Sequence, residues 1–219
     1  MSTHDAPQIL DPRKDLDLQL PGWELFWARL EAEEENEEAR NAMHRKVAEE
    51  ARERWSGVPV AKDPVVAAVR KRFREAGCDP TRYRPSSEAL LRRLLKDEEL
   101  PRIHPLVDVN NFLSVRLMVP CCVLAEGSFT PPLTLRAGAE DESMESLRGP
   151  FSLGGKPLLE DAEGPFGTPI TDGVRVKVLR STAAVWLVAY LPEDLLVPEQ
   201  AAAELDAILR HAPLARRTH

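Results

Sequence analysis

The order of the sequence patterns predicts an α+β fold. Segments with apolar positions at helical spacing lie between residues 21 and 120, and short apolar runs separated by Gly, Pro and acidic turns follow them. Helices that precede strands, instead of alternating with them, are typical of an α+β domain. With 219 residues, 43% hydrophobic and 30% charged, the chain is long enough to bury a substantial core.

The N-terminal region is expected to be an extension. Residues 1–20 contain prolines and no period, so we expect an extended lead-in. Residues 21–57 are predicted to form a long helix or a helical pair that ends at Gly57, with Trp23, Phe26, Trp27 and Leu30 at helical spacing. The run "EAEEENEE" from Glu31 should be solvated, and the aromatic start should pack on the core. We therefore expect residues 1–60 to be an extension with an acidic helix packed on a domain of residues 61–219.

Two amphipathic helices follow. The first has Asp63 as a plausible N-cap, Pro64 in its first turn and Gly77 after its last apolar position. The second has Ser86 or Ser87 available as its cap and Glu88 in its first turn. Pro101 should end it. Its predicted buried face consists of Leu90, Leu91, Leu94 and Leu95.

A third helix, beginning near Pro105, carries a polar stripe. Leu106, Val109, Leu113 and Leu117 share its apolar face. Asn110 and Ser114 lie one turn apart, and Asn111 lies beside them. Buried amides need partners, because an unpaired polar group costs about 1 to 3 kcal/mol. The stripe therefore either bonds neighbouring backbone or faces a cleft and binds a ligand. His104, just before Pro105, could cap the helix, lie on the surface or border such a cleft.

The second half of the chain reads as strands. The predicted strands cover residues 121–125, 133–137, 151–155, 174–179 and 184–191. The last of them is apolar throughout and should be a central strand. Residues 198–212 should form a closing helix, followed by a frayed basic tail. The sequence "GPFGTPITDG" at residues 164–173 is a glycine-rich and proline-rich loop whose backbone could approach a ligand, although it matches no phosphate-binding pattern.

Several function classes are disfavoured. The histidines show no metal-ligand spacing, and neither "GxSxG" nor "HExxH" occurs, so a metal hydrolase or a triad enzyme is not expected. Cys78, Cys121 and Cys122 are expected to be buried thiols. No apolar run has the roughly 20 residues of a membrane span, and the N-terminus lacks the pattern of a signal peptide. These features predict a cytoplasmic protein without a membrane partner.

Charge is distributed unevenly. The net charge is −7, which argues weakly against a nucleic-acid partner. Between residues 70 and 102, however, ten Lys and Arg oppose six Asp and Glu. This segment is either a basic patch or an ordinary solvated helix face.

Three segments carry a family resemblance. The segment "RPSSEALLRRLLKDEELPRIHPLVDVNNFLSVRLMVP", then "LGGK", then "GPFGTPITDGVRV", resemble in type and order the B3/4 domain of the bacterial phenylalanyl-tRNA synthetase beta chain, most closely its free-standing copies. The likeness spans roughly residues 63–192. It implies a three-layer β/β/α arrangement of small sheets with flanking helices. In the synthetase this domain holds an editing site that hydrolyses tyrosine wrongly esterified to tRNA. The resemblance implies that Asn110 and Asn111 line the pocket.

Two positions depart from the synthetase pattern. Cys122 stands where the synthetase has a histidine, and Val188 aligns with its glutamate. The resemblance therefore does not carry tyrosine over as the substrate. Asp172 and Arg175 follow the free-standing pattern.

The resulting expectation is a stand-alone protein that edits mischarged tRNA in trans by ester hydrolysis, with tRNA as partner and without DNA, metal or cofactor. The alternatives are a non-catalytic module that binds tRNA, another RNA or an amino acid in the same cleft, and an interaction protein that uses its acidic helix. The expected catalytic residues are Asn110, Asn111 and Asp172. The expected substrate-binding residues are His104, Ser114, Gly154, Gly155, Phe166, Gly167 and Thr168. The expected RNA-binding residues are Arg102, Arg116 and Arg175.

Overall fold

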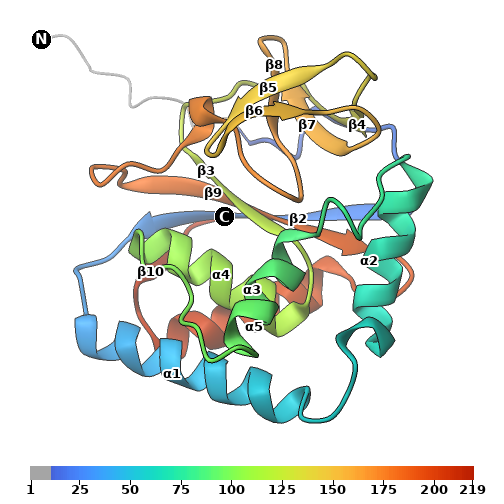
Figure 1. Cartoon of the computed structure of the whole chain (residues 1–219). Helices are drawn as coiled ribbons and strands as arrows, with labels where there is room; N and C mark the ends of the chain where they lie inside the picture. The colour runs from blue at the N-terminus through green and yellow to red at the C-terminus, as the bar shows by residue number, and fades with distance from the viewer. Residues whose placement is uncertain (1–10) are drawn as a thin grey trace, which may run out of the picture.

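A computed structural model describes residues 11–219, which form three layers (Figure 1). Two small sheets are stacked on each other, and helices cover the outer face of one of them. The strands are β1 (Leu16–Leu18), β2 (Trp23–Ala32), β3 (Cys121–Ala125), β4 (Leu133–Ala137), β5 (Ser143–Ser146), β6 (Gly149–Ser152), β7 (Pro157–Asp161), β8 (Gly164–Gly167), β9 (Ala184–Pro192) and β10 (Ala215–Arg217). The helices are α1 (Glu37–Arg54), α2 (Pro64–Glu75), α3 (Ser86–Leu94), α4 (Pro105–Leu117) and α5 (Pro198–His211), with short 3-10 turns η1 (Val60–Lys62) and η2 (Val174–Val176). The predicted three-layer α+β fold is confirmed.

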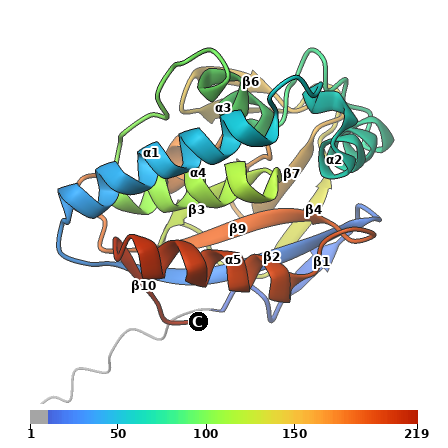
Figure 2. The same cartoon turned by 90° about the horizontal axis from the view of Figure 1, so that it is seen from below.

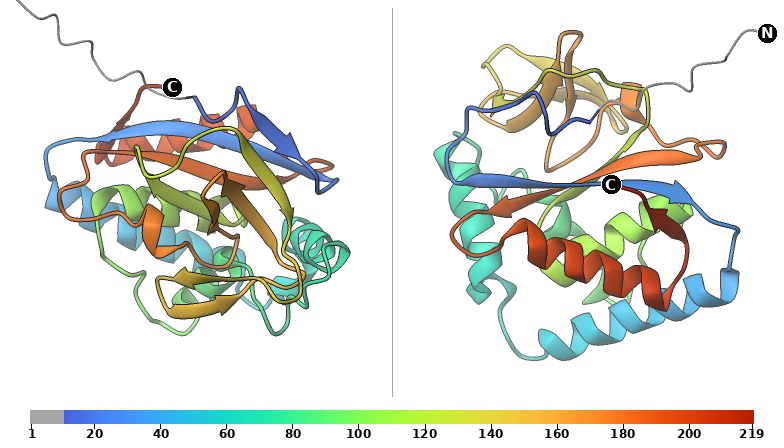
Figure 3. Two further views of the ribbon diagram at one scale, coloured as in Figure 1. Left: turned by 90° about the horizontal axis from the view of Figure 1, so that it is seen from above. Right: turned by 180° about the vertical axis from the view of Figure 1, so that it is seen from behind.

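The middle layer is the sheet that organises the molecule. Its strand order is β10-β2-β9-β3, and all of its pairs are antiparallel. The upper sheet has the order β1-β4-β7-β8, and β5 pairs with β6 in a separate hairpin. Seen from behind, the middle sheet separates the upper strands from α5 and α1 (Figure 3). Strand β9 lies between β2 and β3 and is buried along nearly its whole length, as predicted for a central strand.

The predicted helix at residues 21–57 is wrong in its first part. Residues Trp23–Ala32 form strand β2, and the helix α1 begins only at Glu37, where the Asn36 side chain accepts the Ala39 N–H at 2.9 Å. Strand β2 is covered on both faces, by the upper sheet and by the helices, so most of its residues are buried, and its apolar and aromatic residues do not alternate with polar ones but also fit a helical spacing. The acidic run is exposed, as expected, and the aromatic residues are buried.

Three further expectations are corrected. Residues 174–179 contain the 3-10 turn η2 instead of a strand. The C-terminal tail does not fray, because β10 pairs with β2. The lead-in contains β1, which pairs in parallel with β4, while residues 1–10 lie outside the described part of the chain. Strands β5, β7 and β8 were not expected, and only Phe151 and Ser152 of the predicted strand at 151–155 are in β6.

The predicted helix ends hold well for α2 and α4. Asp63 caps α2 by accepting from the N–H groups of Val65 and Val66, with Pro64 in the first turn. In α3, Ser86 is the first helical residue instead of the cap. Leu91 and Leu94 of its predicted buried face are buried, whereas Leu95 is 37% exposed.

Helix α4 is central in the helical layer. Seen from below, it runs beside α1, and α5 lies along the same face of the middle sheet (Figure 2). The predicted boundary near residue 60 stays a prediction. Residues 16–32 supply one strand to each of the two stacked sheets.

Candidate functional site

Helix α4 starts at a cap made by a histidine. The His104 Nδ1 accepts the Leu106 N–H at 3.3 Å, and Pro105 occupies the first turn. Burial and the nearby Arg40 guanidinium lower the pKa of His104, which keeps its ring neutral and its Nδ1 available as an acceptor. Met118 ends the helix in the left-handed conformation with φ of 59°. His104 is buried, so its geometry supports the capping role.

The polar stripe of α4 is buried but only partly satisfied. Asn110 is 6% exposed and Asn111 is 7% exposed. The Asn110 Nδ2 donates to the Asn111 Oδ1 at 3.3 Å, while the Asn110 Oδ1 is buried and has no hydrogen-bond partner among residues 11–219. Ser114 instead donates to the Val119 carbonyl oxygen at 2.7 Å, which holds the start of β3 against the helix. Ser114 is therefore structural, and the asparagines keep free hydrogen-bonding capacity.

Strand β3 separates the predicted site residues into two groups. Cys121 lies beside Ser114 of α4, on the helical side of the middle sheet. Cys122 points to the other side, where its thiol donates to the Thr168 carbonyl oxygen at 3.3 Å. Both thiols are buried, as predicted, and burial raises the pKa of each. The asparagines and the loop after β8 thus lie on opposite faces of β3, which is an edge strand.

The loop that follows β8 is rigidly built. The Thr168 Oγ1 accepts from the N–H groups of Ile170 and Thr171, at 3.2 and 3.0 Å, and donates to the Thr171 carbonyl at 2.8 Å. A glycine is required at Gly173, because a Cβ there would lie 2.9 Å from the Phe166 carbonyl oxygen. The N–H of Ser86 at the start of α3 donates to the Pro169 carbonyl at 3.0 Å. The loop is therefore fixed both to β3 and to the helical layer.

Unpartnered polar atoms gather where this loop meets the middle sheet. The Asp172 Oδ1, the Tyr190 hydroxyl and the Trp27 Nε1 are buried and have no hydrogen-bond partner among residues 11–219. Asp172 and Tyr190 both lie beside Cys122. We call Trp27, Cys122, Asp172 and Tyr190 the inter-sheet cluster. Trp27 and Cys122 stand on either side of Val188 in one row across β2, β9 and β3.

Asp172 has an unusual carboxyl group. The residue as a whole is half-buried, but its Oδ1 is covered. Burial raises the pKa of Asp172 to about 7, and the Cys122 thiol partly opposes the increase. Both protonation states are consequently populated near neutral pH, which is the property of a general acid or base.

The paired glycines lie at a different junction. Gly155 has φ of 67°, and a Cβ there would lie 2.8 Å from the Gly77 carbonyl oxygen that follows α2. Gly154 forms a bridge with Gly138 after β4. The next residue, Lys156, is 2% exposed, and its Nζ lies 3.8 Å from the centre of the Tyr83 ring. The structure thus gives Gly154 and Gly155 a packing role between the upper sheet and α2.

The three arginines predicted to bind RNA lie apart from one another. Arg175 donates to both carboxylate oxygens of Asp161 at 2.9 Å and lies over the Phe166 ring, so it ties η2 to the upper sheet. Arg116, in the last turn of α4, forms an ion pair with Glu204 at 2.9 Å. Arg102, before the first turn, is exposed and contacts Asn41 and Glu99.

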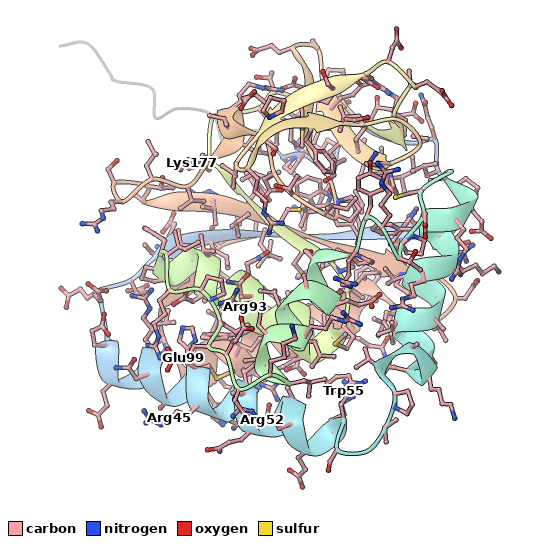
Figure 4. The ribbon with its side chains drawn as sticks, viewed as in Figure 1. Arg45, Arg52, Trp55, Arg93, Glu99 and Lys177 are labelled. Carbon is pink, nitrogen blue, oxygen red and sulfur yellow. The ribbon has the colours of Figure 1, made fainter. Side chains whose placement is uncertain are left out.

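Half of the ten basic side chains between residues 70 and 102 form ion pairs with acids. Arg70 pairs with Glu88, Arg72 with Glu75 and Asp194, and Arg93 with Glu98. Figure 4 shows Arg93 of this segment near α3, while Arg45 and Arg52 lie on α1, outside the segment. Both interpretations of this segment, a basic patch and a solvated helix face, stay predictions.

Sequence reasoning missed a buried network between α1 and α4. The Asp108 Oδ2 accepts from the Arg40 Nε at 2.6 Å and lies 3.0 Å from the His44 Nε2. Asp108 stands between the apolar positions Phe112 and Val115 on the helical wheel, so an acid on a buried face was the available signal.

A hollow of about 1100 Å³ opens elsewhere on the surface. The acidic run and the C-terminal end of α5 line it, with residues such as Glu34, Asn36, Asp206 and Arg210. Within residues 11–219, no set of three His, Cys, Asp or Glu side chains is arranged to hold a metal ion, and no helix is long and apolar enough to cross a membrane.

Comparisons with known proteins address the family. A solved structure, the N-terminal fragment of the phenylalanyl-tRNA synthetase beta-subunit from Pyrococcus horikoshii, matches with a TM-score of 0.45 and 12% sequence identity. The match covers 96% of this chain and 52% of that chain, so this chain spans about half its length. The search of curated proteins gave no match. The family model of the B3/4 domain matches residues 68–203, which is more than half of the chain. The chain therefore belongs to the B3/4 domain family.

Proposed function

We propose that this chain hydrolyses the ester bond of a mischarged aminoacyl-tRNA in trans. The observation that carries the proposal is the Asp172 carboxyl group near the end of the rigid loop, whose Oδ1 is buried without a hydrogen-bond partner among residues 11–219 and which lies beside Cys122 and Tyr190. An unpaired buried oxygen costs about 1 to 3 kcal/mol, and a bound ligand or water would remove that cost. Membership of the B3/4 family supports a site related to aminoacyl-tRNA chemistry.

The chemistry requires little from the protein. An aminoacyl ester is already activated, so a positioned water and a polarised carbonyl suffice without a nucleophile or a metal. In the proposed step a water attacks the carbonyl carbon and passes a proton to ionised Asp172. The carbon–oxygen bond to the ribose then breaks, and the ribose oxygen takes that proton from Asp172. A pKa of about 7 lets Asp172 accept and return a proton at neutral pH.

The asparagines are assigned to the oxyanion. Asn110 donates its Nδ2 to the Asn111 Oδ1, so the Asn111 amide nitrogen is the donor that we assign to the developing charge. The asparagines and Asp172 lie on opposite faces of β3, which is an edge strand, and the loop bonds both Cys122 of β3 and Ser86 of the helical layer. A substrate that binds along this edge could meet both groups.

The partner is proposed to be tRNA, bound at first by its phosphates. Arg102 is exposed near the start of α4 and is the arginine best placed for an anion, since Arg116 and Arg175 are committed to Glu204 and Asp161. We keep the cytoplasm as the proposed location of this reaction.

The second candidate function is a non-catalytic module that binds tRNA, another RNA or an amino acid in the same place. The unpartnered Tyr190 hydroxyl and Trp27 indole favour it, because they can hold a ligand without taking part in chemistry.

One experiment separates these functions. The purified protein is incubated with a panel of aminoacyl-tRNAs, including tRNAs charged with non-protein amino acids, and the remaining ester is measured over time. Turnover of at least one ester, lost in Asp172→Asn, supports the proposal. Salt-dependent tRNA binding without turnover of any ester would replace it with the binding module. Indifference to every tRNA, together with a stable complex formed through the acidic run, would support an interaction protein.

A further inference from the structure

The network between α1 and α4 is the most completely buried charged cluster that the proposed reaction does not use. Asp108 is 0% exposed, and both Arg40 and His44 are buried. Arg40 donates to the Asp108 Oδ2 at 2.6 Å, and the His44 Nε2 lies 3.0 Å from the same oxygen. The His44 ring also meets the Phe112 ring edge-on, with 4.8 Å between centroids. Three contacts therefore fix α1 against one face of α4.

Stability alone does not explain this arrangement. Burying an ion pair costs desolvation energy that its attraction often fails to recover, and apolar residues of similar size frequently do as well. The Asp108 Oδ1 is also buried without a partner among residues 11–219. Buried ionic groups are instead well suited to fix the register of packed elements. Here the bonds define the rotation and the height of α4 relative to α1.

The asparagines of α4 depend on that rotation. Asn111 stands three residues after Asp108 and lies on a neighbouring part of the same helix surface. At about 100° per residue, a small rotation of α4 would change the direction in which both asparagines point. Arg40 and His44 belong to α1, and the family match begins only at residue 68. Arg40 and His44 thus come from a segment outside the matched residues, while Asp108 lies within them.

We infer that Arg40 and His44 are positioning residues that act through Asp108 to aim Asn110 and Asn111 at the substrate. The inference rests on the proposed function and deepens it, because it makes α1 part of the catalytic apparatus.

The chain offers a matched control. Arg70 of α2 donates to both carboxylate oxygens of Glu88 of α3, at 2.8 and 2.5 Å, and Glu88 is 2% exposed. This pair also joins two helices through a buried carboxylate, but neither helix carries the asparagines. Loss of Arg70 should therefore lower the stability of the protein without changing the direction in which Asn110 and Asn111 point.

The test compares Arg40→Gln, His44→Gln and Arg70→Gln in the full chain. The measurements are kcat and KM for the ester found in the aminoacyl-tRNA panel, the melting temperature, and the side-chain amide NMR signals of Asn110 and Asn111. We expect Arg40→Gln to lower kcat at least tenfold with KM changed less than twofold, and to shift both amide signals. Arg70→Gln should lower the melting temperature, keep kcat within twofold of the wild type and leave the amide signals in place.

The outcomes separate the inference from the proposed function. Equal losses of kcat in Arg40→Gln and Arg70→Gln, or unchanged amide signals in Arg40→Gln, would overturn the positioning role. If Arg40→Gln does not fold, His44→Gln decides, because it keeps the Arg40–Asp108 ion pair and should show the same changes at smaller size. If the wild type cleaves no ester, the proposed function fails, and the amide signals still test whether α1 sets the orientation of the asparagines.

Discussion

Cys122 of β3 is directly paired with Val188 of β9. These are the two positions at which the sequence departs from the resembled synthetase, where a histidine and a glutamate are expected. Because the two residues are paired, both departures from the synthetase pattern alter the same part of the structure, beside Asp172 and Tyr190. A thiol and an isopropyl group cannot form the ion pair or hydrogen bond that an imidazole and a carboxylate would form.

The pairing predicts strong coupling between substitutions. Val188→Glu places a carboxylate at a position that is 0% exposed, and an uncompensated buried charge should cost about 3 to 5 kcal/mol of the free energy of unfolding. Combined with Cys122→His, the carboxylate gains a partner, so we expect about 1 to 3 kcal/mol to return. Urea unfolding of the wild type, both single variants and the double variant measures this coupling. Additive losses would show that the two side chains do not meet.

Asn111→Ala should abolish most of the proposed activity. Removal of an oxyanion donor typically lowers kcat by about 10² to 10³, while the fold should persist because Ser114, not Asn111, bonds the backbone at Val119. Single-turnover deacylation measures the loss. The control is Ser87→Ala, which removes another buried helical side chain that donates to the Met118 carbonyl. Full activity in Asn111→Ala would exclude the assignment of Asn111 to the oxyanion.

Asp172 predicts a specific dependence of stability on pH. Its pKa rises from 3.8 to about 7 in the folded protein because the carboxyl group is buried. The folded state therefore binds this proton more tightly than the unfolded chain does. The resulting stabilisation is complete below about pH 4 and is lost as the pH rises through about 7. Asp172→Asn removes this titration, so the variant should gain stability relative to the wild type between pH 5 and pH 8.

Urea unfolding of the wild type and of Asp172→Asn, at pH 5 and at pH 8, checks this prediction. Other carboxyl groups have the opposite trend. The pKa of Asp161, for example, is lowered by its bonds with Arg175 despite its burial. Only the difference between variant and wild type isolates Asp172, and parallel pH profiles of the two proteins would contradict a raised pKa.

Local signals predicted α4 well and β2 poorly. The cap, the proline and the apolar face of α4 all lie within one short segment, so the sequence contains the whole argument for the helix. Strand β2 is buried on both faces, so its apolar residues do not alternate with polar ones, and their spacing does not separate a strand from a helix. The decisive partner of β2 is β9, which is far away in the sequence.

Long-range pairing also limited the prediction of the site. Arg175 follows the loop of the family pattern and looked free to bind RNA, yet both of its terminal nitrogens donate to Asp161 of β7. The role of Asp108 could not be predicted from its own segment, because its partners Arg40 and His44 lie on α1. Asn110, Asn111 and Asp172 could be selected by residue type, but their separation by β3 required the topology of the middle sheet.

Gly155→Ala should destabilise the protein more than Gly127→Ala. Both glycines have a positive φ, 67° and 76°, so an alanine at either position costs about 1 to 2 kcal/mol of backbone strain. A Cβ at Gly127 meets nothing within 4 Å, whereas one at Gly155 would lie 2.8 Å from the Gly77 carbonyl oxygen. The atom that this Cβ would meet belongs to the backbone and cannot easily move aside. We therefore expect the free energy of unfolding to fall by at least about 1 kcal/mol more in Gly155→Ala than in Gly127→Ala. Urea unfolding of the two variants measures the difference. Equal losses would show that the Gly154–Gly155 turn does not pack tightly on the end of α2.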